Sequence, residues 1–182
     1  MLRQIGVPFR LVGTELDESP LPAEAPLAYV SRLAAAKAEA GWRGSPGLDE
    51  APVLAADTAV LLEGRILGKP KDLDDAENML LELSGRTHQV LTAVALRSAG
   101  GNEIRVSESS VTFRKLQAGE ARAYCETGEP LDKAGAYAIQ GLAAVFIADL
   151  KGSYSGVMGL PLFETAALLR SAGLRLGLCA GP

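Results

Sequence analysis

Cysteine and histidine are scarce in this chain of 182 residues, which contains two cysteines and one histidine. Cys125 and Cys179 lie far apart in the sequence and do not make a disulfide framework. An ordinary zinc site needs three or four cysteine or histidine ligands, so this composition excludes one. Any metal ion bound here would be a hard cation held by carboxylates.

Long apolar runs and an excess of basic charge are also absent. No stretch approaches the roughly 20 apolar residues of a membrane-spanning helix, and the first residues lack the pattern of a secretory signal. We therefore expect a cytoplasmic protein with no membrane partner. The chain has 18 Lys and Arg against 22 Asp and Glu, a formal net charge of −4. This balance argues against a partner such as nucleic acid, which needs a basic surface.

The hydrophobic pattern predicts an α/β fold with a mixed sheet. Helices are expected at Leu27–Ala40, Asp74–Leu83, Leu116–Glu126 and Pro161–Ser171, with Asp74 and Glu77 as a capping box. Strands are expected at Val53–Ala56, Ala59–Glu63, Arg65–Leu67, Thr87–Arg97, Glu103–Phe113, Tyr137–Ile139 and Ala143–Ile147. Strands and helices follow each other without strict alternation, which indicates both hairpins and crossovers.

Carboxylates gather in two places that could support catalysis. Glu15, Asp17 and Glu18 lie within four positions, so one loop could direct their oxygens at one point. The plainer interpretation is a solvated acidic turn. Asp57 follows a short apolar strand, at the place where sheet proteins often bind ligands. There its charge would need a metal, a lysine or several hydrogen-bond donors, unless it only caps a turn.

Several polar residues stand out among apolar or glycine-rich neighbours. Lys69 lies in a Gly/Pro loop that suits an anion, and Arg86 lies between a predicted helix and strand. Lys37 lies on an Ala- and Leu-rich helix, where a snorkelling side chain is the plain alternative. Gln140 follows the loop at 128–139 and is expected to be a buried residue of an apolar strand. It would then need a partner, either a nucleobase edge or a neighbouring backbone.

Familiar catalytic motifs are incomplete in this sequence. The segment from Gly64 to Pro70 is one residue too short for a phosphate-binding P-loop and lacks its Ser or Thr. The segment from Gly152 to Gly156 resembles a nucleophile elbow, but its central residue is Tyr154. The candidate positions described above hold several carboxylates and lysines but no nucleophile–base pair. This set of residues favours a reaction in which a metal ion assists the attack of water on a phosphate chain.

Several blocks, in order along the chain, resemble the Maf family of nucleotide pyrophosphatases, from about Leu2 to about Gly173. The blocks are Asp17-Glu18-Ser19, Ala35-Ala36-Lys37-Ala38, Ala56-Asp57-Thr58, Gly68-Lys69-Pro70, Leu83–His88, Gly128–Gly141 and Gly159-Leu160-Pro161-Leu162. The run Gly-Glu-Pro-Leu-Asp-Lys-Ala-Gly-Ala-Tyr, which starts at Gly128, is the most specific of them.

The resemblance implies both a fold and an activity. The fold would be an elongated, twisted mixed sheet with flanking helices and two lobes around a cleft. It would form a single domain over residues 1–172, followed by a flexible tail at 173–182. The activity would be cleavage of a nucleoside triphosphate between its α and β phosphates, with Mg²⁺ or Mn²⁺ as cofactor. The family also implies a homodimer.

The resemblance further implies roles for individual residues. Asp57 would accept a proton and, with Glu18, hold the metal, whereas Lys37 and Lys69 would face the phosphates. Substrate-binding positions would be Thr58, Arg86, Asp132, Lys133 and Gln140. Thr58 and Gln140 resemble the branch that acts on dTTP and UTP rather than the branch that acts on 7-methyl-GTP.

One departure from the family concerns the start of the chain. Members usually open with an apolar strand and a Ser-x-Ser-Pro-Arg-Arg loop, whereas Met1–Gly6 resembles the end of the helix that follows. Either the start is set too late, which we favour because the other catalytic residues are present, or the chain is short. A short chain would fit a catalytically silent nucleotide-binding or cell-division regulatory protein. A third alternative is a phosphohydrolase for inosine-type or methylated nucleotides.

Overall fold

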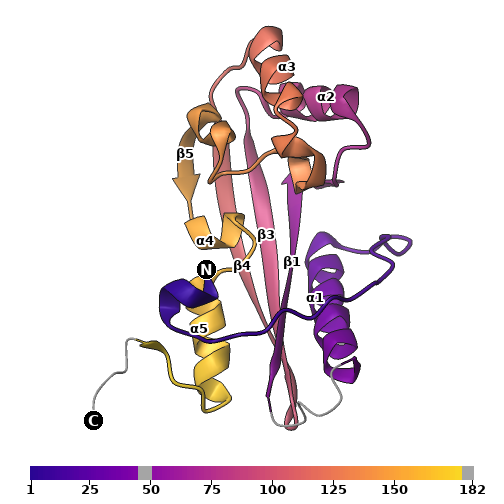
Figure 1. Cartoon of the computed structure of the whole chain (residues 1–182). Helices are drawn as coiled ribbons and strands as arrows, with labels where there is room; N and C mark the ends of the chain where they lie inside the picture. Colours follow the sequence, from indigo (N-terminus) through magenta and orange to yellow (C-terminus); the bar gives the residue numbers. More distant parts are fainter. Residues whose placement is uncertain (45–50, 178–182) are drawn as a thin grey trace. The chain divides into compact units, whose positions relative to one another are not determined.

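The computed structural model describes residues 1–44 and 51–177 (Figure 1). The helices are α1 (Pro26–Arg43), α2 (Leu73–Leu83), α3 (Ala118–Glu126), α4 (Tyr154–Val157) and α5 (Leu162–Ser171), with 3₁₀ helices η1 (Leu2–Ile5), η2 (Glu129–Asp132), η3 (Ala134–Ala136) and η4 (Leu142–Phe146). The strands are β1 (Val53–Leu62), β2 (Arg65–Leu67), β3 (Thr87–Ser98), β4 (Gly101–Phe113) and β5 (Ile147–Lys151). In these ranges no helix is long and apolar enough to cross a membrane.

Among the described residues, five strands form a sheet in the order β2-β1-β3-β4-β5. β1 pairs with β2 antiparallel, with Leu61 opposite Ile66, and β4 pairs with β5 antiparallel, with Val111 opposite Leu150. β3 and β4 are neighbours joined only by Ala99 and Gly100, a connection that permits an antiparallel hairpin and no parallel crossover. The predicted α/β class with flanking helices is confirmed.

The chain divides into two compact units. The first comprises Met1–Asp57, Thr92–Ser107 and Gly159–Pro182, and the second comprises Thr58–Leu91 and Glu108–Met158. β1 therefore passes from one unit to the other at the peptide bond between Asp57 and Thr58. Cys179 and the last part of the predicted tail, residues 178–182, lie outside the described residues.

The core of the first unit joins β3 to α5. Val94 and Leu96 pack with Leu168 and Leu169, and Leu2 and Ile5 of η1 pack against this cluster. Figure 1 shows η1, at the N-terminus, beside α5. α1 starts at Pro26 and buries Val30, Leu33, Ala34, Ala38 and Gly41 along one face, as a 3.6-residue period requires. Leu27 was expected on that face but is 54% exposed, because it lies in the first turn, just after the helix begins.

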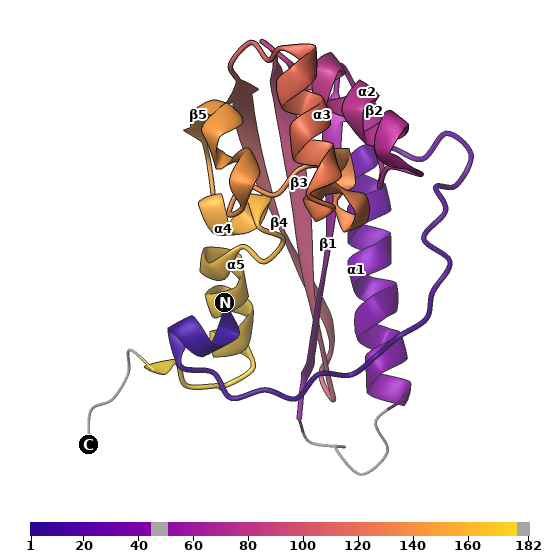
Figure 2. The same cartoon turned by 45° about the horizontal axis from the view of Figure 1, so that its top comes forward.

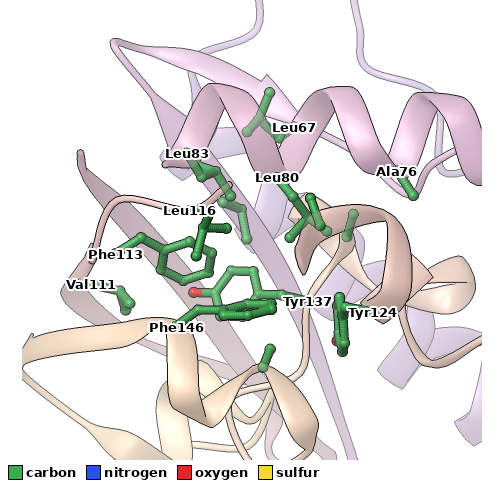
Figure 3. Packing of buried hydrophobic residues seen from close by; sticks show 14 of the residues in the cluster. Leu67, Ala76, Leu80, Leu83, Val111, Phe113, Leu116, Tyr124, Tyr137 and Phe146 are labelled. Carbon is green, nitrogen blue, oxygen red and sulfur yellow. The ribbon is translucent and has the colours of Figure 1, made fainter. Parts of the chain in front are cut away.

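The core of the second unit is an aromatic cluster covered by α2 and α3. Phe113, Tyr137 and Phe146 meet edge to face or tilted, with 4.9 Å between the ring centroids of Phe113 and Tyr137 (Figure 3). Leu80 and Leu83 of α2 complete this cluster, and α2 lies beside α3 (Figure 2). Each fully buried leucine contributes about 1.5–3 kcal/mol by its removal from water, so this face holds α2 in place.

Several predicted element boundaries were wrong. β1 runs unbroken through Asp57 where two strands were expected. The cap of α2 is Asp72, whose carboxylate accepts a hydrogen bond from the N–H of Asp75 at 2.8 Å, so the Asp74–Glu77 capping box is wrong. Pro161 lies at the N-cap of α5 rather than in its first turn.

The segment after α3 differs most from its prediction. Residues 137–139 form no strand, and most of the predicted strand Ala143–Ile147 is the 3₁₀ helix η4, after which β5 begins at Ile147. Short apolar runs do not distinguish a strand from a buried helical turn by periodicity, which explains the error.

Candidate functional site

A lysine between two carboxylates is the central feature of the first unit. Lys37 on α1 places its Nζ 2.7 Å from Oδ1 of Asp57 on β1 and 2.6 Å from Oε1 of Glu18. The Asp57 side chain is 8% exposed, whereas the Glu18 side chain is 39% exposed. The snorkelling alternative for Lys37 is therefore wrong, because its ammonium is held in place by two ion pairs.

The surrounding charges fix the protonation state of Lys37. Burial lowers the pKa of the Lys37 ammonium, but the hydrogen bonds to Asp57 and Glu18, together with the negative charges of these two residues, outweigh burial and leave the pKa raised. Burial also raises the pKa of the nearby Tyr29 hydroxyl, and the negative charges of Asp57 and Glu18 raise it further. The ammonium of Lys37 and the neutral phenol of Tyr29 are thus the stable forms.

Three side chains that the sequence analysis missed hold the segment that carries Glu18. The Tyr29 hydroxyl donates to the backbone carbonyl of Glu18 at 3.0 Å, and Arg32 donates to the carbonyl of Ser19 at 3.2 Å. Arg32 also binds Glu24 through Nε at 2.6 Å and Nη2 at 2.8 Å, which lowers the pKa of Glu24 to about 2. Tyr29 and Arg32 are three residues apart on α1, a spacing that places side chains on one helix face and was a usable signal.

The three acids that could converge in one loop behave differently. Glu18 reaches Lys37, whereas Asp17 accepts a hydrogen bond from the N–H of Ser19 at 2.9 Å. Hydrogen bonds from the side chain and from the N–H of Ser19 lower the pKa of the Asp17 carboxyl. Glu15 is exposed on the extended segment that leads to them. The convergence of all three acids is therefore wrong, and one of them enters the site.

The donor set of this cluster is suited to a hard cation, but it is small. Residues 1–44 and 51–177 contain no group of three or more His, Cys, Asp or Glu that could hold a metal ion. Glu18, Asp57 and Lys37 together carry a formal charge of −1, which favours a further cation. Two carboxylates are nevertheless a common protein contribution to Mg²⁺, which keeps several waters and takes substrate phosphates as its other ligands.

A second group of charges lies in the second unit. The N–H of Gly135 donates to the carbonyl of Gly68 at 3.0 Å, which ties the 128–141 loop to the loop that carries Lys69. Lys133 Nζ lies 2.6 Å from Oδ1 of Asp132. Lys133, and to a smaller extent Lys69, lowers the pKa of the Asp132 carboxyl. The predicted residues Lys69, Asp132 and Lys133 are therefore neighbours.

Other predicted substrate residues of the second unit have separate surroundings. Arg86 forms an ion pair with Glu63 of the β1–β2 turn and donates to the carbonyl of Glu82 at 3.5 Å. Thr58 is half-buried on β1. Gln140 is exposed in a turn, so its expected burial in a strand is wrong. That turn is closed by the N–H of Gly141, which donates to the carbonyl of Ala138 at 3.0 Å.

The single histidine belongs to the core. His88 is 2% exposed, and its Nε2 lies 2.8 Å from the hydroxyl of Tyr137. Burial lowers the pKa of His88 to about 4, so the imidazole is neutral at pH 7. Its surroundings are the rings of Phe113 and Tyr137 at centroid distances of 5.2 and 5.4 Å, the environment of a structural histidine.

Comparison with known proteins gives one consistent result. The family model described as Maf-like protein matches residues 1–172. A protein of Nitrosomonas europaea named dTTP/UTP pyrophosphatase is 51% identical, over 96% of this chain and 89% of its own length. Proteins with the same name in Aromatoleum aromaticum and Chromobacterium violaceum are 53% and 50% identical, each over 97% of this chain and 91% and 90% of their own lengths.

Proposed function

This chain belongs to the Maf family, and we propose that it is a nucleoside triphosphate pyrophosphatase that converts dTTP and UTP to the monophosphate and pyrophosphate. The observation that carries the proposal is the placement of Lys37 between the carboxylates of Glu18 and Asp57. Such a cluster combines a candidate base with a cation of fixed position. The names of relatives about 50% identical support the choice of substrate.

Asp57 is the proposed proton acceptor of the reaction. Its carboxylate is almost buried and is held by the Lys37 ammonium, so it is oriented before a substrate arrives. In the proposed reaction it takes a proton from the water that attacks the phosphate chain. Lys37 fixes the position of that carboxylate and adds a positive charge where the phosphates gain negative charge.

Glu18 and Asp57 are the residues that would hold Mg²⁺ or Mn²⁺. Such an ion, when bound, neutralises charge on the phosphate oxygens and lowers the pKa of a bound water. The segment that carries Glu18 is fixed to α1 through Tyr29 and Arg32, so this acid presents its carboxylate from a constrained backbone. The ion pair between Glu18 and Lys37 keeps that carboxylate beside Asp57.

The second unit supplies the proposed groups for substrate binding. Lys69 and Lys133 carry positive charge suited to phosphate oxygens, and Asp132 holds the Lys133 ammonium in place. Arg86 is a further candidate phosphate ligand that would exchange its exposed ion pair with Glu63 for substrate. Thr58 and the carboxamide of Gln140 are proposed to recognise the base, since an amide can both donate to and accept from a uracil edge.

A product assay tests the proposal. The purified chain is incubated with dTTP, UTP, 7-methyl-GTP and dITP, with Mn²⁺ and then with Mg²⁺, and pyrophosphate and orthophosphate are measured separately. We expect pyrophosphate with the monophosphate, and the highest rates with dTTP and UTP. Release of orthophosphate would contradict the proposal, and nucleotide binding without turnover would favour the silent regulatory alternative. We also propose a cytoplasmic homodimer from the family resemblance, which sedimentation and cell fractionation would check.

A further inference from the structure

A tyrosine and a glutamate hold, from both sides, the turn that carries the exposed Gln140. The Tyr124 hydroxyl donates to Oε1 of Glu129 at 2.8 Å and accepts from the N–H of Ala138 at 3.2 Å. Oε2 of Glu129 accepts from the N–H of Leu142 at 3.2 Å. The two residues thus bind the backbone at the first residue of the turn and immediately after its last residue.

The turn itself is a short rigid element. The N–H of Gly141 donates to the carbonyl of Ala138, so Gln140 occupies the third of its four positions. Gln140 is exposed, whereas Ala138 is buried. The backbone under Gln140 is therefore fixed by hydrogen bonds on both sides, while its side chain stays available to a ligand.

The support under the turn is anchored in the core. The ring of Tyr124 is 4% exposed and packs edge to face on Phe146 with 5.4 Å between centroids (Figure 3). Both oxygens of Glu129 accept hydrogen bonds from neutral donors, and no ion pair competes for them among the described residues. Gly141 lies against this carboxylate, because a Cβ built there would lie closer to Glu129 than real Cβ atoms approach a neighbour.

We propose that Tyr124 and Glu129 are positioning residues that set Gln140 for recognition of the nucleobase, an inference that rests on the proposed function. Neither residue touches the substrate in this proposal. They remove the conformational freedom of the turn in advance, so the contact between Gln140 and the base costs less entropy on binding. Loss of the support lowers the contribution of the base to binding and leaves the contribution of the phosphates unchanged.

The test compares a ligand that has a base with one that lacks it. The dissociation constants of α,β-methylene dTTP, which resists cleavage, and of inorganic triphosphate are measured for the full chain. We expect Tyr124→Phe and Glu129→Ala each to weaken binding of the dTTP analogue about tenfold, the equivalent of one lost hydrogen-bonded support. Binding of inorganic triphosphate should change by less than about twofold. Gln140→Ala should give the same pattern, and Glu129→Ala should add little to it because both act through one contact.

Two further variants separate positioning from general damage. Glu126→Ala, on the same helix as Tyr124 and exposed, should leave both dissociation constants unchanged. Gly141→Ala should reproduce the effect of Glu129→Ala, since its backbone angles of −103° and −153° suit alanine and the atoms nearest its new methyl are those of the Glu129 carboxylate. Adding Gly141→Ala to Glu129→Ala should have no further effect.

The inference is overturned if Tyr124→Phe and Glu129→Ala weaken both ligands equally or neither, or if Gln140→Ala retains full affinity for the analogue. A wild-type chain that binds neither ligand overturns both this inference and the proposed function. A wild-type chain that binds the analogue but releases no pyrophosphate from dTTP contradicts only the proposed function, because the two dissociation constants still report on the support of the turn.

Discussion

Lys37 and Asp57 are separated by 20 positions in the sequence, yet Nζ of the lysine lies 2.7 Å from Oδ1 of the aspartate. Lys37 lies on the face of its helix that buries Leu33, Ala34 and Gly41, so its amino group is directed to the strand. The side chain of Lys37 is 21% exposed, so a ligand in water can still approach the pair. This combination of fixed position and access is what the proposed catalytic role of the pair requires.

Replacement of Asp57 by Asn should abolish turnover. The amide has nearly the shape of the carboxylate but cannot accept a proton from water, so we expect a loss of at least about 1,000-fold in kcat. Pyrophosphate release from dTTP measures it, with Asp149→Asn on the exposed part of β5 as the matched control. Substantial turnover by Asp57→Asn would remove Asp57 from the role of proton acceptor.

Replacement of Lys37 by Met should make the protein depend on a divalent cation for stability. The change leaves two carboxylates, those of Glu18 and Asp57, without their shared ammonium, and we expect a loss of about 1–2 kcal/mol in the free energy of unfolding. Mn²⁺ should restore more stability to this variant than to the wild-type chain, because it can take the place of the lost positive charge.

Urea unfolding with and without Mn²⁺ checks this prediction. Lys115→Met, at an exposed position, should respond to the metal as the wild-type chain does. If Lys37→Met and the wild-type chain gain equal stability from Mn²⁺, Glu18 and Asp57 do not form the cation site.

Acid should weaken the protein through His88 before it affects the carboxylates. The pKa of His88 falls from 6.5 to about 4 on burial, so the unfolded chain takes up the proton first as the pH falls. The stability from the neutral imidazole is complete above pH 6.5 and is lost as the pH falls toward 4. We expect a loss of about 2–3 kcal/mol between pH 6.5 and 4.5.

The variant His88→Gln isolates this effect. Its amide can still pair with the Tyr137 hydroxyl but does not titrate, so its unfolding free energy should be nearly flat over that pH range. Glu24 and Glu120 have pKa values lowered to about 2, and their contribution is lost only below pH 4.5. If the unfolding free energy of His88→Gln falls with pH as steeply as that of the wild-type chain, another group causes the acid sensitivity.

Two glycines with left-handed backbone angles should differ in their response to alanine. Gly135 has φ +68° and Gly64 has φ +82°, so alanine strains both by about 1 kcal/mol. A Cβ at Gly135 would also lie 2.8 Å from Cγ1 of Val60, whereas nothing lies within 4 Å of one at Gly64. Thermal unfolding should show a clearly larger loss of stability for Gly135→Ala than for Gly64→Ala. Similar losses would mean that the Val60 side chain moves aside with no loss of stability.

The elements best predicted from the sequence were those with a long continuous signal. α1 has apolar residues at helical spacing, and its burial follows that spacing. The β3–β4 hairpin was predicted from two long β-rich runs on either side of a glycine-rich turn. The prediction of strands between Tyr137 and Phe146 was wrong, because the side chains of Tyr124 and Glu129 hold the backbone of this segment. Such distant hydrogen bonds leave no period in the local sequence.

The site was predicted to a similar extent. Lys37, Asp57 and Glu18 could be named from the sequence, but their joint position depends on which acid of the loop is drawn inward. That choice is made by Tyr29 and Arg32, which bind carbonyl groups rather than charged side chains. Carbonyl groups occur in every residue, so a sequence does not reveal which of them a side chain will bind.

The close approach of Gly141 to the carboxylate of Glu129 has a consequence for evolution. Any side chain at position 141 must displace that carboxylate, so position 141 cannot change freely while Glu129 is kept. Aligned relatives that carry Ala or Ser at position 141 should therefore carry a residue shorter than Glu at position 129. Two substitutions separate the pair Glu129 and Gly141 from a pair with a shorter residue at 129 and Ala or Ser at 141. The first of these substitutions is the disfavoured one, because it removes or displaces the Glu129 carboxylate while nothing yet compensates for it.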